Sequence, residues 1–317
     1  MTDRPWHILF AESFDPSAME QMRAVARVSI LDRCDEKTLS QAVPDCDALL
    51  VRSLAQVTGK VLERATRLRV IGRGGVGVDN IDLEAAKERG IPVVYTPAAS
   101  TDAVADLTVG LMIAVVRGIA RGDVMVRSGQ FAKGRETLLG RELGGLTLGI
   151  VGLGRIGRAV ARRCAAGFGM RILYNDIVDP GPLDFEAEEV TKEELYRRSD
   201  IVTLHVPLTP LTRGLIDERA LALFGEGSIL LNTSRGAVVD SEALAGGLVR
   251  GVPGGAGLDV FDPEPLPAGH PLLTAPNTVF TPHLGARSPA ALARMNAVVE
   301  DVIRVLRGET PMYPAWQ

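Results

Sequence analysis

Three polar residues in the last third of the chain have side chains that suit acid chemistry. Arg235 and His283 each follow a short apolar run, and Glu264 lies in a loop between two prolines. A guanidinium holds a carboxylate and a carbonyl with its planar fork, and histidine carries protons near neutral pH. A carboxylate beside His283 would favour the imidazolium form, which can act as a general acid. Taken alone, each residue also fits a structural role: Arg235 in a surface ion pair, Glu264 at the rim of a site, and His283 as a cap.

A second set of residues predicts where a cofactor binds. Residues 146–176 read LTLGIVGLGRIGRAVARRCAAGFGMRILYND, which is typical of a strand, a tight turn, a helix and a second strand. Gly152 permits the turn, Gly154 lets backbone approach a pyrophosphate, and Gly157 lets the helix pack closely on the strand. The first turn of the helix then offers N–H groups and a positive dipole end to the phosphates.

Asp176 narrows the choice of dinucleotide. It lies 22 positions after Gly154, at the end of the second strand. A carboxylate there accepts hydrogen bonds from the ribose hydroxyls and repels a 2′-phosphate. Residues 177–180 contain no arginine that would hold such a phosphate. These observations favour NAD over NADP, and with Arg235, Glu264 and His283 they predict hydride transfer to or from a small acid.

The rest of the chain reads as alternating strands and helices. Strands are expected at 7–11, 28–31, 48–51, 68–72 and 92–95, and the same alternation resumes after Asp176. Such repeats form parallel sheets covered by helices, which bind ligands at the carboxyl ends of their strands. Two loops at those ends are candidate substrate loops, 51–53 and 72–80. The second contains four glycines within six residues, whose exposed N–H groups suit a carboxylate.

Two long helical patterns, at about 101–121 and 288–306, divide the 317 residues into two domains. We expect residues 1–99 and 288–317 to form a discontinuous substrate domain and residues 100–287 to form the cofactor domain. The segment 128–141 is polar and is expected to be a loop. The predicted fold class is α/β, with two doubly wound parallel sheets.

The composition excludes several classes of function. The net charge of -4 provides no basic field for nucleic acid, and the apolar window 107–116 is about half the length of a membrane span. The three cysteines have no metal-ligand or disulfide spacing, so we expect reduced core thiols and no metal site. No signal-peptide pattern precedes the first strand. We therefore expect a cytoplasmic protein that binds neither nucleic acid nor a membrane.

Several segments together resemble the D-isomer-specific 2-hydroxyacid dehydrogenases. They are GLGRIG with Asp176, HVPLTPLT at 205–212, LLNTSRGAVVD at 230–240, GLDVFDPEP at 257–265 and TPHLGA at 281–286. VRS and GRGGVGVDN in the first domain extend the resemblance over nearly the whole chain. The resemblance implies a usually homodimeric NAD enzyme with a Rossmann NAD-binding domain inserted into a flavodoxin-like substrate domain, and an active site in the cleft between them.

The resemblance also implies roles for individual residues. Arg235 would orient a 2-keto acid, Glu264 would pair with the histidine, and His283 would exchange the proton. The cofactor would be held by Gly152, Gly154, Arg155, Ile156, Gly157, Asp176, His205, Val206, Pro207, Thr212, Thr233 and Asp259, with Asp259 at the nicotinamide carboxamide. The substrate would be held by Arg52, Ser53, Arg73, Gly75, Val76 and Gly77, with the N–H groups of Val76 and Gly77 on its carboxylate.

The motifs leave the substrate open between two types. Arg52 and Arg73 match basic positions of phosphoglycerate dehydrogenases, and Arg135 is a third candidate. Segments 101–107 and 121–129 instead resemble glyoxylate and hydroxypyruvate reductases, and 95–100 lacks the asparagines usual in the phosphoglycerate pattern. A different class also remains open: an NAD(H)-responsive regulatory protein on the same fold would keep these residues.

Overall fold

The chain forms two compact units in a computed structural model that describes residues 5–316. One unit comprises Met1–Ser100 and Arg287–Gln317, and the other comprises Thr101–Ala286. The expected domain boundaries, 99/100 and 287/288, differ from these by one residue each. The second unit is thus inserted between two segments of the first.

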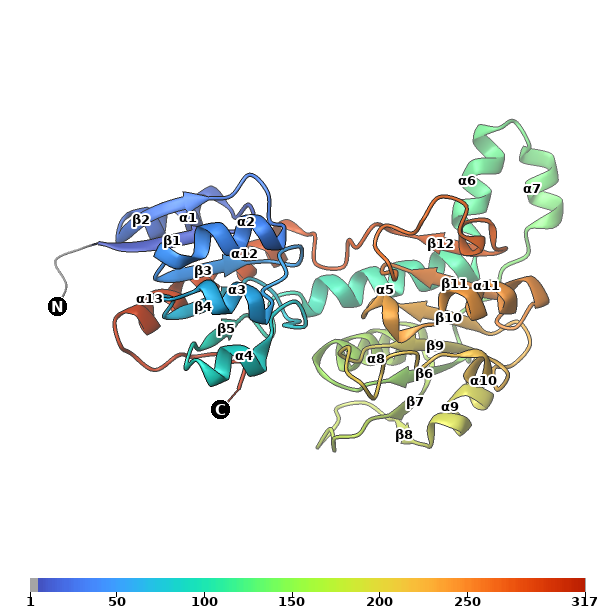
Figure 1. The fold of residues 1–317 in the computed structure, drawn as a ribbon. Coiled ribbons are helices and arrows are strands. Elements are labelled where there is room, and N and C mark those ends of the chain that lie inside the picture. Colours follow the sequence, from blue (N-terminus) through green and yellow to red (C-terminus); the bar gives the residue numbers. More distant parts are fainter. Residues whose placement is uncertain (1–4, 317) are drawn as a thin grey trace. The chain divides into compact units, whose positions relative to one another are not determined.

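The first unit contains a five-stranded parallel sheet with the strand order β2-β1-β3-β4-β5 (Figure 1). This is the flavodoxin-like order expected from the sequence. The strands are β1 (Trp6–Phe10), β2 (Ala26–Ile30), β3 (Ala48–Val51), β4 (Val70–Arg73) and β5 (Val93–Tyr95). The helices are α1 (Pro16–Arg23), α2 (Glu36–Ala42), α3 (Gly59–Arg64), α4 (Leu83–Glu88), α12 (Pro289–Asn296) and α13 (Val298–Leu306), with a 3₁₀ turn at Val43–Asp45.

The second unit contains a seven-stranded parallel sheet with the order β12-β11-β10-β9-β6-β7-β8. Its first six strands along the chain follow the Rossmann order. The strands are β6 (Thr147–Val151), β7 (Arg171–Asn175), β8 (Glu188–Glu189), β9 (Ile201–Leu204), β10 (Ile229–Asn232), β11 (Gly255–Leu258) and β12 (Thr278–Phe280). The helices are α5 (Thr101–Val116), α6 (Ile119–Arg127), α7 (Phe131–Thr137), α8 (Arg155–Phe168), α9 (Lys192–Arg198), α10 (Glu218–Leu221) and α11 (Ser241–Arg250), with 3₁₀ turns at Gly236–Val238 and Pro271–Thr274.

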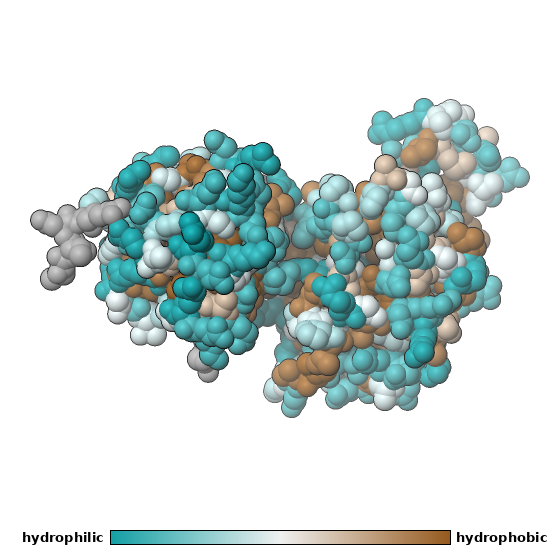
Figure 2. All heavy atoms as spheres, viewed as in Figure 1, coloured by the Kyte–Doolittle hydropathy of each residue, from teal (hydrophilic) through white to brown (hydrophobic). Residues whose placement is uncertain are grey.

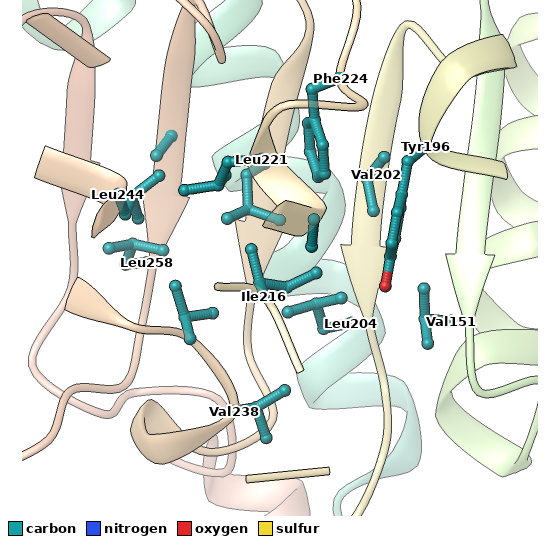
Figure 3. Close-up of a cluster of buried hydrophobic side chains, with 14 of the residues drawn as sticks. Val151, Tyr196, Val202, Leu204, Ile216, Leu221, Phe224, Val238, Leu244 and Leu258 are labelled. Atoms are coloured by element: carbon teal, nitrogen blue, oxygen red, sulfur yellow. The ribbon is translucent and has the colours of Figure 1, made fainter. Parts of the chain in front are cut away.

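Apolar side chains fill both faces of the seven-stranded sheet. On one face, Leu204, Leu258 and their neighbours pack against α9, α10 and α11 (Figure 3). Tyr196 and Phe224 stack there with ring centroids 5.3 Å apart. On the other face, α5 and α8 cover Leu148, Ile150 and Leu231. Because both faces are covered, the central strands are mostly apolar, with Thr203 as a buried polar residue inside β9, and the two-residue edge strand β8 is exposed and polar.

Side-chain caps fix the starts of several helices. Asp82, Asp240 and Ser288 accept N–H hydrogen bonds at the starts of α4, α11 and α12, and Pro289 follows Ser288. Thr191 and Glu194 form a capping box at the start of α9. Each of these caps depends only on neighbouring residues, so the residue types alone indicate where these helices begin.

Both expected long helices are divided into two shorter helices in the structure. The first ends at Val116, because Gly118 adopts a left-handed conformation with φ 63°. The polar segment expected to be a loop instead contains α7, and α6 precedes it. In the C-terminal helix, i to i−3 hydrogen bonds at Ala297 and Glu300 interrupt the α-helical pattern and separate α12 from α13.

Over residues 5–316, no single helix is long and apolar enough to cross a membrane. Helices α5 and α6, which are bent by 62° relative to each other, meet this criterion of length and composition only when they are counted as one segment. Much of α5 is buried in the core of its own unit.

Candidate active site

The glycine-rich turn after β6 has the geometry of a dinucleotide cradle. Gly152 has φ 91°, and a Cβ there would lie 2.6 Å from the carbonyl oxygen of His205. A Cβ on Gly157 would lie 2.1 Å from the oxygen of Gly152, so the helix can approach only with glycine. Gly154, the N-cap of α8, has open space beside it and no side-chain cap. The N-terminus of α8 therefore fits a pyrophosphate, with Arg155 and Ile156 in its first turn.

Asp176 lies at the end of β7, directly beside this turn. Its Oδ2 accepts a hydrogen bond from the N–H of Leu153 at 2.6 Å, and its Oδ1 accepts one from Val178 at 3.0 Å. These bonds hold the carboxylate at the edge of the cradle and leave it lone pairs for a ligand. Ile177 and Val178, which follow it, are strongly exposed apolar residues.

The loop after β9 forms the neighbouring wall of the cradle. The N–H of His205 donates to Val151 at 2.8 Å, and its ring Nε2 lies 3.0 Å from Thr203 Oγ1. Burial lowers the pKa of His205 to about 3, so the ring is neutral at physiological pH. Thr212 Oγ1 donates to the carbonyl of Pro207 at 2.6 Å and fixes the loop that contains Val206.

Arg235 follows β10 in an extended conformation that its neighbours determine. Asn232 Nδ2 donates to the carbonyl of Arg235 at 2.9 Å, and Asn232 Oδ1 accepts from the N–H and hydroxyl of Ser234. A Cβ on Gly236 would lie 1.9 Å from the carbonyl of Phe261, so this glycine lets two loops meet. Those loops are the one that contains Arg235 and the one that leads to Glu264.

Glu264 and His283 form a hydrogen-bonded pair. Glu264 Oε2 lies 2.9 Å from His283 Nδ1, and Glu264 Oε1 accepts from the N–H of Phe261 at 2.9 Å. Burial alone would raise the pKa of Glu264, but the hydrogen bonds from His283 and Phe261, with the charges of His283 and Arg235, lower it overall. Because Nδ1 faces the carboxylate, Nε2 is the ring nitrogen left for a substrate.

Asp259 holds the loop that contains His283. Its buried carboxylate accepts from Thr281 Oγ1 at 2.6 Å and from the N–H groups of Leu284 and Gly285 at 2.7 and 2.8 Å. His283 itself has φ 52°, a left-handed conformation that is costly for this residue type. The three bonds to Asp259 compensate for that strain. A contact between Asp259 and the nicotinamide carboxamide remains a prediction.

In the first unit, the glycine-rich loop after β4 folds around an arginine. A Cβ on Gly75, which has φ 149°, would lie 1.3 Å from Nη1 of the buried Arg73. That nitrogen donates to the carbonyl of Gly74 at 3.1 Å. Within residues 5–316, the N–H groups of Val76 and Gly77 have no hydrogen-bond acceptor. They are therefore available to an anionic ligand, and their contact with a substrate carboxylate remains a prediction.

Arg52 and Ser53 begin the loop after β3. The guanidinium of Arg52 lies over the Phe14 ring, 5.9 Å from its centroid, and Nη2 lies 3.6 Å from Met295 Sδ. Arg135, the third candidate cation, lies on α7 in the other unit. In the part of the chain that the structure describes, no cluster of three or more His, Cys, Asp or Glu is able to hold a metal ion.

The three cysteines are free. Burial raises the pKa of both Cys46 and Cys164 to about 12, so these two are inert core thiols, whereas Cys34 is half-buried.

Four residues at these loops are absent from the sequence-based set. Glu12 and Asn80 hydrogen-bond the backbone of the Arg52 loop, and Asn232 holds the Arg235 loop. Thr108 of α5 lies 2.9 Å from Thr233, with both hydroxyls buried. Position at a strand end is a signal for Glu12 and Asn232, since each lies within two residues of the end of β1 or β10. Nothing in the sequence indicates the partners of Asn80 and Thr108.

Comparison with known proteins adds a second kind of evidence. Residues 109–285 match the family described as D-isomer specific 2-hydroxyacid dehydrogenase, NAD binding domain. A hydroxypyruvate reductase of Thermotoga maritima is 42% identical over 279 residues, which cover 87% of this chain and 90% of the relative. A D-3-phosphoglycerate dehydrogenase of Methanocaldococcus jannaschii is 42% identical over 306 residues, 95% of this chain. The chain spans only 58% of the length of that relative.

Solved structures share the fold over nearly the whole chain. A protein of Thermus thermophilus is 42% identical with a TM-score of 0.90, covering 98% of this chain and 99% of that one. The D-lactate dehydrogenase of Aquifex aeolicus, complexed with NAD and lactic acid, is 30% identical with a TM-score of 0.87 and coverages of 95% and 96%. An NADPH-dependent glyoxylate/hydroxypyruvate reductase of Sinorhizobium meliloti, in complex with NADP and malonate, is 28% identical with a TM-score of 0.89 and coverages of 98% and 97%.

Proposed function

Because the chain belongs to the D-isomer specific 2-hydroxyacid dehydrogenase family, we propose that it transfers a hydride between NAD and C2 of a small D-2-hydroxy acid or 2-keto acid. The observation that carries the proposal is the pair formed by Glu264 and His283, 2.9 Å apart in the unit that also contains Arg235 and the dinucleotide cradle. A proton carrier, a carboxylate partner and a guanidinium are the groups that such a reaction requires.

The proposed chemistry follows from the groups in the second unit. NADH, when bound, would supply the hydride for C2 of a 2-keto acid, and NAD would accept it in the reverse direction. Arg235 holds the carboxylate and the carbonyl of the acid with its planar fork. His283 donates the Nε2 proton to the carbonyl oxygen, which becomes the hydroxyl, and Glu264 stays ionised and stabilises the imidazolium before the transfer. In oxidation, neutral His283 accepts the same proton.

Binding of the substrate involves the first unit in this proposal. The free N–H groups of Val76 and Gly77 suit its carboxylate, with Gly75 shaping the loop. Arg52, Ser53 and Arg73 suit the far end of the acid. Relatives are named for hydroxypyruvate, glyoxylate and 3-phosphoglycerate, so the substrate is an acid of two or three carbons, with or without a phosphate.

Two variants test the reaction. We expect His283→Gln and Arg235→Ala each to lower kcat for NADH oxidation by about 10² to 10⁴, the range for loss of one acid–base or clamping group. Binding of NADH, followed by its fluorescence, should be unchanged because neither residue belongs to the cradle. The rates are measured with a panel of 2-keto acids: glyoxylate, hydroxypyruvate and phosphohydroxypyruvate. The reverse reaction, oxidation, is measured with 3-phosphoglycerate and NAD. Full turnover by either variant would refute the assignment, and NADH binding without any turnover by the wild type would favour the regulatory class instead.

We also propose that the protein is a homodimer. In α6 and α7, the structure buries only Gly134, while Val124, Val126 and Phe131 are each more than half exposed, and Leu139 follows at 96%. Figure 1 shows these two helices standing out from the sheet of their own unit, and Figure 2 shows a few hydrophobic residues among hydrophilic ones there. The exposed apolar side chains of this arm, α6 and α7, suit a contact with a second copy of the chain, because a monomer gains nothing by exposing them.

A further inference from the structure

Two side chains from other parts of the first unit hold the loop that follows β3. Oε1 of Glu12 accepts hydrogen bonds from the N–H groups of Arg52, Leu54 and Ala55 at 2.9, 3.1 and 3.0 Å. Nδ2 of Asn80 donates to the carbonyls of Arg52 and Ala55 at 3.0 and 2.7 Å. The backbone N–H and C=O groups of Arg52 and Ala55 are therefore all hydrogen-bonded by side chains. In a strand, neighbouring strands would provide these bonds.

These bonds form at the switch point of the five-stranded sheet. β1 and β3 are adjacent although β2 lies between them in sequence, so the strand order reverses there. Glu12 follows β1 by two residues and Arg52 follows β3 directly. Sheets of this order bind ligands in the crevice at that point. Here the half-buried carboxylate of the chain itself occupies a nest of three N–H groups, the arrangement in which anions bind.

The guanidinium of Arg52 is held by apolar neighbours and has no carboxylate hydrogen-bonded to it among residues 5–316. Burial lowers the pKa of Arg52, the nearby charge of Glu12 raises it, and the charge of Arg287 lowers it again. Glu12 is thus near enough to balance part of the charge, but its Oε1 is committed to the backbone. The cation remains available for an anionic ligand.

We propose that Glu12 is a positioning residue for Arg52, fixing residues 52–55 so that the guanidinium is held ready for the substrate. Asn80 completes the arrangement, because it ends the glycine-rich loop 72–80 and so joins the two candidate substrate loops through one side chain. This inference rests on the proposed function, in which Arg52 binds the substrate. Glu12 acts through the loop and need not touch the substrate.

The test compares three single variants in the full chain. Glu12→Ala should raise KM for the best 2-keto acid about tenfold or more, because three backbone donors lose their acceptor, while kcat changes by less than about threefold. Glu12→Gln keeps an acceptor oxygen in the same place and should restore most of the KM. The matched control is Asp82→Ala, which removes another carboxylate of the same unit that accepts a backbone N–H, at the start of α4. The control should lower the Tm without raising KM.

A double variant separates positioning from a merely structural role. Arg52→Met should raise KM. Adding Glu12→Ala to Arg52→Met should raise KM little further, because Glu12 affects the substrate only through Arg52. Three outcomes would overturn the inference. Glu12→Ala could raise KM equally in the wild-type and the Arg52→Met background, or KM could stay unchanged in Glu12→Ala or in Arg52→Met. If Glu12→Ala does not fold, Asn80→Ala takes its place in the comparison. A wild type that turns over no 2-keto acid overturns the proposed function itself, whereas an active wild type with unchanged variants overturns only this inference.

Discussion

At the level of single residues, the proposed preference for NAD over NADP depends on one carboxylate. Asp176 is fixed by hydrogen bonds to Leu153 and Val178 at the edge of the dinucleotide cradle. A 2′-phosphate at the ribose would meet that negative charge, and Ile177 and Val178 provide no cation to balance it. Among the related structures, one is a complex with NAD and another a complex with NADP, so the preference of this chain needs a direct test.

We predict that Asp176→Ala raises the ratio of kcat/KM for NADPH to that for NADH by about tenfold or more, because the repulsive element is removed. The KM for NADH should rise as well, since the ribose loses its acceptor. Steady-state rates with both cofactors give the ratio. Asp179→Ala is the matched control. Asp179 lies three residues after Asp176 and also accepts a hydrogen bond from a nearby backbone N–H, that of Gly181 at 2.7 Å. An unchanged ratio in Asp176→Ala would contradict the preference for NAD.

At the level of elements, the proposed catalytic groups come from three loops that follow β10, β11 and β12, and a glycine lets two of those loops meet. Parallel strands bring their carboxyl ends to one edge of the sheet, but only close backbone approach brings Arg235 near Glu264. Gly236 is the point of that approach, since a Cβ would overlap the carbonyl of Phe261 at 1.9 Å. Backbone atoms cannot move aside as a flexible side chain does, so the site depends on this glycine.

Gly236→Ala should therefore lower both the Tm and kcat/KM, the latter by at least about tenfold, because a shift of about 1 Å in positioned groups costs that much or more. Gly110→Ala is the matched control. Gly110 lies inside α5 with open space beside it, so alanine there should stabilise the protein by about 0.5–1 kcal/mol and leave activity unchanged. Thermal unfolding and steady-state kinetics of the two variants test the contrast. Equal behaviour of the two variants would show that the loops have room to separate.

For the molecule as a whole, buried groups couple stability to pH. Burial lowers the pKa of His205 to about 3, whereas in the unfolded chain it lies near the reference of about 6.5. Between these values the unfolded state binds more protons, so the stability contribution of His205 is complete above a pH of about 6.5 and is lost as the pH falls. We predict that the Tm of His205→Gln falls less steeply from about pH 7 to about pH 4 than that of the wild type. Parallel slopes in calorimetric scans would contradict it.

Assembly is the other property of the whole molecule. Val126→Glu on α6 should convert the proposed homodimer into a monomer, because it places a charge in an apolar contact that has to lose water. Val249→Glu on α11 is the control, since Val249 is a similarly exposed valine outside the arm. Light scattering after gel filtration measures the mass of each. A monomeric wild type, or a dimeric Val126→Glu, would refute the role of the arm.

Features that depend on local spacing can be predicted from the sequence alone. The strand, turn and helix around Gly152, Gly154 and Gly157 follow from the limited backbone conformations of non-glycine residues, and the helix caps follow from side chains three residues apart. The α/β alternation also predicts the two parallel sheets. The break of the first long helix at Gly118 is not predicted, because a single glycine inside an apolar pattern does not by itself end a helix.

How residues distant in sequence meet is visible only in the folded chain. Glu264 and His283 are 19 positions apart, and their 2.9 Å contact depends on the bonds between Asp259 and the His283 loop. Glu12 meets the backbone of Arg52 across 40 positions. Hydrogen bonds between loops depend on where each strand ends and how adjacent strands are ordered, and no local pattern of residue types contains that information. Residue types and spacing therefore predict which side chains carry the chemistry, and the fold decides which residues hold them.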